Sequence, residues 1–154
     1  SLEEIEATLK RFGATGLAHA EDERRVALMF VAKGSDGHER RIRYGLRLPH
    51  RNDERFTHVA INQFQQKRRG AAEADAAYRE EVNRLWRALA AGIKAKLVMV
   101  QEGIETLEEA FYAHIMLPSG NTLYEETGAQ IAEAYRTGLM PPQFAGLLPA
   151  PEKQ

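Results

Sequence analysis

Residues 25–48 decide the fold, and they read RVALMFVAKGSDGHERRIRYGLRL. The first eight are apolar at nearly every position, which is typical of a strand in the centre of a sheet. From Arg40 to Leu48 the apolar side chains alternate with arginine or glycine, the period of a strand with one buried face. Asp36-Gly37 supplies the positive φ that a tight hairpin turn needs. The stretch therefore predicts two antiparallel strands.

The segments on either side supply a third strand and four helices. A short strand is expected over 16–20, and an acidic turn, Glu21-Asp22-Glu23, would join it to the next. Apolar residues spaced by three and four predict a helix over 2–12 and a long helix over 73–101. The patterns Thr106-Leu107-Glu108-Glu109 and Thr122-Leu123-Tyr124-Glu125 match capping boxes, and they predict two short helices, to about His114 and to about Thr137.

This order predicts an α+β fold. An N-terminal helix precedes a three-stranded antiparallel β-meander packed by a long helix, and two short helices and an extended Pro-rich tail follow. We expect one domain over 1–138, with a long basic loop at 49–72, and a tail over 139–154. A connection of that length is expected to be functional, mobile or partly folded.

The amino-acid composition excludes several classes of protein. The 154 residues include no cysteine, which excludes disulfides, thiolate metal ligands and cysteine nucleophiles. No apolar run reaches the length of a membrane span, and the acidic, amphipathic start is unlike a signal peptide. We therefore expect a cytoplasmic protein with no membrane contact and no cofactor.

Charge is strongly segregated along the chain, although the formal net charge is only −1. Residues 38–69 contain nine Lys or Arg and three Asp or Glu, a net of +6. Residues 101–154 contain two bases and eight acids, a net of −6. This pattern indicates two surfaces, of which the basic one suits an anionic partner.

Arginines on the predicted strand form the first candidate site. Period-two geometry places Arg41, Arg43 and Arg47 on one face, about 7 Å apart for alternate residues. Such a row could contact the phosphates of a nucleic acid through bidentate bonds. The alternative is a solvated face whose arginines pair with glutamates on neighbouring strands, namely Glu21, Glu23 or Glu39.

The second candidate site lies in the predicted loop, where Lys67, Arg68 and Arg69 form a basic cluster near Phe64. Aromatic side chains among bases suit single-stranded nucleic acid, because stacking tolerates any base. The alternative is that Phe64 anchors the loop to the core.

A metal site or a catalytic centre has less support. His50, Asp53 and His58 could hold a divalent metal with an outside ligand, but their spacing matches no known motif. No nucleophile elbow or phosphate-binding glycine motif is present. We therefore predict no catalytic residue and no metal ligand.

Several segments resemble a family of small uncharacterised proteins of phages and prophages. They include Arg11–Gly16, Trp86–Leu89, Ile93–Leu97, Gly103–Phe111 and His114–Gly120. The resemblance implies an origin in a mobile element, a cytoplasmic setting and a role in DNA metabolism or host take-over, and it assigns no site. The predicted topology is also similar to that of single-strand annealing proteins and, with its leading helix, to double-stranded RNA-binding domains, although fold analogy carries little functional weight.

These observations favour a non-enzymatic protein that binds single-stranded DNA in a phage recombination or replication system. A protein-interaction module that acts through the acidic half and the tail is the main alternative, with a homo-oligomer formed through that tail. A metal-dependent nuclease around His50, Asp53 and His58 is the second.

Overall fold

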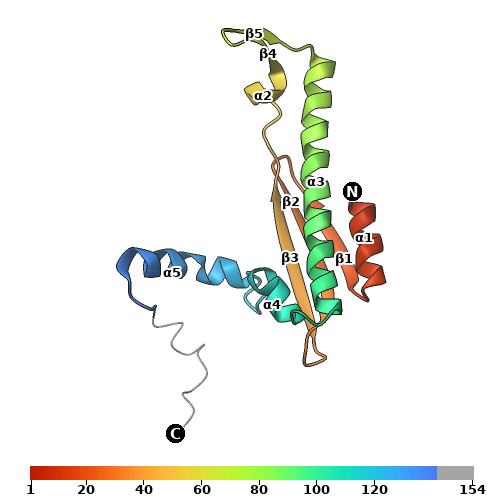
Figure 1. The fold of residues 1–154 in the computed structure, drawn as a ribbon, viewed down its shortest axis with the longest axis vertical. Coiled ribbons are helices and arrows are strands. Elements are labelled where there is room, and N and C mark those ends of the chain that lie inside the picture. Colours follow the sequence, from red (N-terminus) through yellow and green to blue (C-terminus); the bar gives the residue numbers. More distant parts are fainter. Residues whose placement is uncertain (142–154) are drawn as a thin grey trace.

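A computed structural model describes residues 1–141 (Figure 1). The elements follow in this order: α1 (Leu2–Arg11), β1 (Thr15–Glu21), β2 (Arg25–Lys33), β3 (Glu39–Arg47), α2 (Glu54–Thr57), β4 (His58–Asn62), β5 (Gln65–Arg68), α3 (Ala71–Gln101), α4 (Leu107–Phe111), the 3-10 helix η1 (Tyr112–His114) and α5 (Leu123–Thr137). The predicted α+β order is confirmed. Most of the tail expected over 139–154 lies outside the described residues.

Strands β1, β2 and β3 form the predicted antiparallel meander with β2 in the centre. The acidic turn between β1 and β2 is held by Asp22, whose carboxylate accepts the N–H groups of Arg24 and Arg25, each at 2.8 Å. Gly37 adopts φ +81° in the turn between β2 and β3, as the Asp-Gly pair predicts.

One face of this sheet carries the core. Leu28, Phe30 and Ile42 are fully buried there, against Ile5 of α1 and Ile93 of α3. Each such side chain contributes about 1.5–3 kcal/mol by leaving water. Alternate residues point to the opposite face, which neither α1 nor α3 covers (Figure 1). We call this second face the open face.

The two halves of α3 differ in what they bury. Ala90, Ile93 and Leu97 in the C-terminal half lie in the core, whereas Tyr78 is the one buried residue among positions 71–89. Tyr78 packs edge-on against Phe56 of α2, with ring centroids 5.6 Å apart. Figure 1 shows this N-terminal half of α3 rising beyond the sheet.

The segment predicted as a loop over 49–72 folds in part. Besides α2 it forms a hairpin of β4 and β5, which we call the arm (residues 58–68). At its turn the Asn62 side chain accepts the N–H of Phe64 at 2.8 Å. Neither face of the arm is buried, so its sequence has no apolar period, and periodicity therefore could not reveal it.

Helix α5 projects from the body on the side of the sheet away from α1 (Figure 1). Thr122 and Glu125 form the predicted capping box, and Gly138 ends the helix with φ +71°. Just before α5, Ile115 bridges Ile42 and so extends the β3 edge. None of the residues in α5 is buried, and Glu125 in its first turn pairs with Arg43 of β3. No helix within residues 1–141 has the combined length and apolar character of a membrane span.

Candidate nucleic-acid interface

The predicted arginines of β3 lie on the strand that borders the open face. The register pairs Arg41 with Val31, Arg43 with Met29 and Arg47 with Arg25. The side chains of all three arginines therefore leave the strand on the open face. Between them Gly45 opposes Ala27, and both are exposed. The centre of the open face is therefore small and apolar, with arginines at its border.

Arg43 already has a structural role. Its guanidinium lies 2.5 Å from the Glu125 carboxylate and donates to the Gly120 carbonyl at 3.2 Å. The Thr122 N–H also donates to Glu125, at 2.8 Å. The bond from the Thr122 N–H, first of all, and the interaction with the Arg43 guanidinium lower the pKa of Glu125 and keep its carboxyl charged. The pair fastens the start of α5 to β3.

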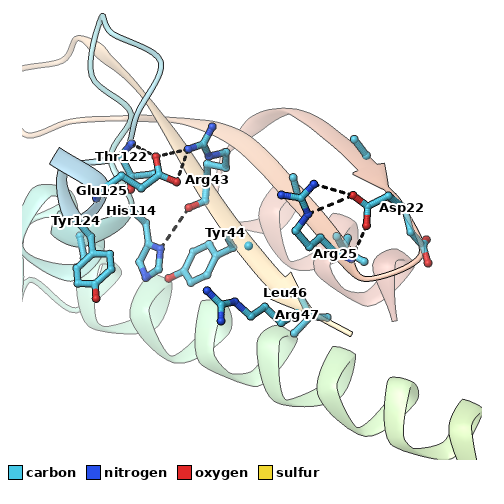
Figure 2. A pocket seen from close by; sticks show the side chains of 16 residues that line it. Asp22, Arg25, Arg43, Tyr44, Leu46, Arg47, His114, Thr122, Tyr124 and Glu125 are labelled. Atoms are coloured by element: carbon cyan, nitrogen blue, oxygen red, sulfur yellow. Dashed lines mark hydrogen bonds and ion pairs between the residues drawn. The ribbon is translucent and has the colours of Figure 1, made fainter. Parts of the chain in front are cut away.

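The other two arginines of the row are exposed. Within residues 1–141 neither Arg41 nor Arg47 has an ion-pair partner, and none of the predicted pairs with Glu21, Glu23 or Glu39 forms. Arg25, opposite Arg47, is neutralised by Asp22 at 3.0 Å. Figure 2 shows the Arg47 side chain turned back along β3 toward Tyr44.

Tyr44 and His114 stack on each other, with ring centroids 3.9 Å apart and 17° between the planes. Burial raises the pKa of Tyr44 to about 12, and its buried hydroxyl has no hydrogen-bond partner among the described residues. Burial also lowers the pKa of His114, whose Nδ1 lies 3.3 Å from the Arg43 carbonyl oxygen. Both rings are therefore neutral at pH 7.

These groups border one groove of about 890 Å³ along the edge of β3 (Figure 2). Its lining combines three arginines (Arg25, Arg43 and Arg47) and three acids (Glu21, Asp22 and Glu125) with the rings of Tyr44, His114 and Tyr124. Tyr124 comes from the first turn of α5 and is 63% exposed. The groove has the size of small-ligand sites, and it offers one cation that is unpaired within residues 1–141, Arg47, for a phosphate and aromatic rings for a base.

The arm presents the second predicted cluster. Phe64 is at its tip and is 86% exposed, so it does not anchor the segment to the core. Lys67 and Arg68 are exposed on β5. Arg69 instead donates to the carbonyls of Arg55 and Phe56, at 3.4 and 3.2 Å, and so fixes the base of the arm.

A few contacts hold the arm on α3. Arg51 lies over the Tyr78 ring at 4.4 Å and pairs with Asp75 at 2.6 Å. Arg55 of α2 lies 3.7 Å from the carboxylate of Glu81 in α3. Bases from the predicted loop are thus used to attach the arm, which leaves its tip free for a partner.

The two predicted clusters lie apart along the molecule. Figure 1 shows β3 leading upward into α2, with the arm beyond it at the end of the long helix. Arg43 and Arg47 line the groove, Arg41 lies further down β3, and Phe64, Lys67 and Arg68 are on the arm. A ligand that reached all of them would have to be extended.

His50, Asp53 and His58 do not form a metal site. His50 accepts the Asn52 N–H at 3.2 Å, His58 Nδ1 lies 2.8 Å from the Thr57 hydroxyl, and Asp53 lies 3.7 Å from Arg55. Within residues 1–141 no three His, Cys, Asp or Glu side chains converge as a metal would require.

Sequence reasoning missed most of the groove. Tyr44 and His114 are 70 positions apart, and Arg43 and Glu125 are 82 apart, so no local pattern connects them. The one available signal was the segregation of charge, since the acidic region supplies the partner of Arg43. Asn62 likewise gave a weak turn signal for the arm.

A comparison of the chain with models of known protein families, with curated proteins and with solved structures finds no match. What the protein does must therefore be inferred from the groove and the arm.

Proposed function

We propose that this protein binds single-stranded nucleic acid, with single-stranded DNA as the substrate, and catalyses no reaction. The groove at the edge of β3 is the observation that carries the proposal. It brings Arg47, which has no ion pair among the described residues, beside the rings of Tyr44 and Tyr124, and Arg25 and Arg43 line it as ion pairs with Asp22 and Glu125. Cations that follow a backbone, next to rings on which bases stack, are the combination by which proteins bind single strands.

The arm supports an extended path for the strand. From Arg55 to Ala72 the chain has four bases and no acid, and Phe64 stands at the exposed tip. Lys67 and Arg68 would contact phosphates, and Phe64 would stack on a base. Arg41 and Arg47 would contact the same strand further along. The resemblance to phage proteins adds that this strand would belong to recombination or replication.

Arg47 is the most informative residue for a test, because it is exposed and has no ion-pair partner in the described part of the chain. Arg43 is less suitable, since its loss would also release Glu125 and α5. A matched control is Lys94, an exposed base of α3 that does not line the groove. Arg47→Glu and Lys94→Glu change the net charge equally.

The experiment is fluorescence anisotropy of a labelled thymidine oligonucleotide over a series of salt concentrations. We expect wild type and Lys94→Glu to bind, with affinity that falls steeply as salt rises. Arg47→Glu should bind at least tenfold more weakly, and its slope against salt should be shallower by about one phosphate contact. Phe64→Ala should lose about 1–3 kcal/mol, the range for one stacked base, with the slope unchanged.

Two results would contradict the proposal. One is the absence of binding by wild type at low salt. The other is an equal loss of affinity in Arg47→Glu and Lys94→Glu. That result would show that the oligonucleotide responds to the net charge of the protein and has no specific site. Either result would favour a protein partner for the acidic half.

A further inference from the structure

The outer edge of β3 presents backbone groups to the groove. The Met116 N–H donates to the Arg41 carbonyl at 2.8 Å on this outer side. Because both backbone groups of a residue point to one side of an antiparallel strand, and successive residues alternate, the odd-numbered residues of β3 all point outward. Gly45 and Arg47 line the groove, and among residues 1–141 no backbone group pairs with them on that side.

An extended chain already covers the beginning of this edge. Ile115 bridges Ile42, whereas η1, directly before Ile115, is not extended and ends the pairing. The last contact is that of His114 Nδ1 with the Arg43 carbonyl oxygen, at 3.3 Å. From there to Arg47 the edge is open within the described residues. Open strand edges pair with another extended chain, so this stretch of the groove selects an extended peptide.

The groove favours an uncharged peptide over a second copy of β3. Two β3 strands paired about Gly45 would place Arg43 of each copy opposite Arg47 of the other, and like charges directly opposite destabilise a sheet. The three arginines and three acids of the lining give the groove no net charge. Between them Ala27 and Leu46 supply apolar surface.

The C-terminal tail of the chain contains an uncharged segment of suitable length. Residues 137–151 include no Asp, Glu, Lys or Arg, and residues 143–148 (QFAGLL) include no proline. Tyr124 of α5 lines the groove, and Gly138 at the end of α5 is about 21 Å away by the helical rise. Six residues from Gly138 to Phe144 also span about 21 Å when extended. The segment from Phe144 onward can therefore return to the groove.

We propose that residues 143–148 dock in the groove as a fourth strand of the sheet, beside β3. The segment enters at the start of α5, which Glu125 holds to Arg43, and runs toward Arg47, parallel to β3. Figure 2 shows Glu125 near Arg43, and Arg47 further along the strand. Because the segment belongs to the same chain, its effective concentration at the groove is high.

This docking goes beyond nucleic-acid binding and does not rest on it, and its test contains no nucleic acid, so the two can fail separately. If both hold, the tail and a single strand compete for one groove. The tail would then regulate access of the strand to Arg47 and Tyr44.

The first test measures amide hydrogen exchange in the full chain by NMR. The variant carries Ala145→Pro and Gly146→Pro. Since N–H groups alternate in direction along a strand, one of two consecutive prolines removes a bond to β3 in either register. The matched control carries Ala150→Pro and Gln154→Pro, two prolines outside residues 143–148.

We expect the amides of Gly45 and Arg47 to exchange at least tenfold more slowly in wild type and in the control than in the variant. The amides of Tyr44 and Leu46 point toward β2, so their exchange should be the same in all three chains. These two amides also show that the sheet remains folded.

The second test identifies which tail occupies the groove. The chain contains no cysteine, so Ala150→Cys accepts a spin label at a single position. A labelled chain enriched in nitrogen-15 and diluted in unlabelled chains of natural isotope content should show broadened amides at Arg47 and Leu48. When the label and the isotope are on different chains, those amides should stay sharp.

Three outcomes would overturn the proposal. The Gly45 and Arg47 amides could exchange equally fast in all three chains, which would show that nothing covers the edge. They could stay protected in the Ala145→Pro, Gly146→Pro variant, which would assign the edge to another occupant. Broadening could appear only between chains, which would assign the groove to the tail of a second copy.

Discussion

The two halves of α3 belong to one continuous helix, but they pack against different parts of the molecule. The C-terminal half buries Ala90, Ile93 and Leu97 in a core shared with the sheet and α1. The N-terminal half buries only Tyr78, against Phe56, and holds the arm outward. Stability is therefore concentrated at one end of the molecule, whereas the arm is attached by a few contacts that can change without unfolding the body.

The largest expected effect is on the core end. Phe30→Ala removes a fully buried ring that packs edge-on against Phe111 at 5.7 Å. We expect the free energy of unfolding to fall by about 3–5 kcal/mol, the usual cost of deleting a core phenylalanine. Urea denaturation measures it. Phe64→Ala at the arm tip is the control and should change it by less than about 0.5 kcal/mol. Comparable losses in the two variants would show that the arm contributes as much to stability as the core.

At the other end, Tyr78→Ala should release the arm and leave the body folded. The loss is limited to the free energy that docks α2 and the arm on α3, since these segments can open locally. Hydrogen exchange should show faster exchange over 54–80 and unchanged protection in β2 and β3. If protection fell equally in the sheet, the two ends of α3 would form one cooperative unit.

A smaller effect is expected at the start of α5. Thr122→Ala removes the side chain that accepts the Glu125 N–H at 3.3 Å in the capping box. We expect α5 to lose about 1 kcal/mol of stability, seen as faster exchange in that helix alone. Thr137→Ala, at the exposed end of α5, is the matched control. If both substitutions accelerated exchange in α5 equally, the capping box would not be the feature that stabilises this helix.

The smallest effect concerns pH. The Thr122 N–H and the Arg43 guanidinium keep the pKa of Glu125 below its ordinary value of 4.5. A carboxyl with a lowered pKa contributes stability above its ordinary pKa and loses it as pH falls through the folded value. The attachment of α5 should therefore hold at neutral pH and weaken only below pH 4.5.

The Thr122 amide resonance reports this titration by NMR, because that amide donates to the carboxylate. We expect a midpoint below 4.5, which Arg43→Met should move upward without restoring the ordinary value, since the Thr122 bond remains. A midpoint at the ordinary value in wild type would show that Glu125 is not held by these two groups.

Local sequence patterns predicted the elements that bury a face or carry capping residues. The alternation in Arg40–Leu48 predicted β3, the three- and four-residue spacing predicted α3, and Thr122 with Gly138 predicted both ends of α5. In each case burial or capping imposes a period or a residue type that can be read locally. The arm was predicted as a loop because it buries neither face, so no such constraint acts on its sequence.

The candidate site was predictable only in outline. Alternation placed Arg41, Arg43 and Arg47 at the border of one face, and the basic cluster with Phe64 proved to lie on an exposed hairpin. The local pattern could not reveal that Glu125 holds Arg43, or that His114 stacks on Tyr44. Those contacts depend on how α4 and α5 return to the β3 edge, which is decided by long-range packing.

The most direct measurement is an NMR titration of the labelled protein with a short thymidine oligonucleotide at low salt. Binding of a single strand along the groove and the arm predicts shifts at the amides of Tyr44, Arg47 and Tyr124 and over residues 58–68, reversed by added salt. The core half of α3 should not change. Shifts confined to the acidic residues 101–111, or no shifts at low salt, would contradict the account.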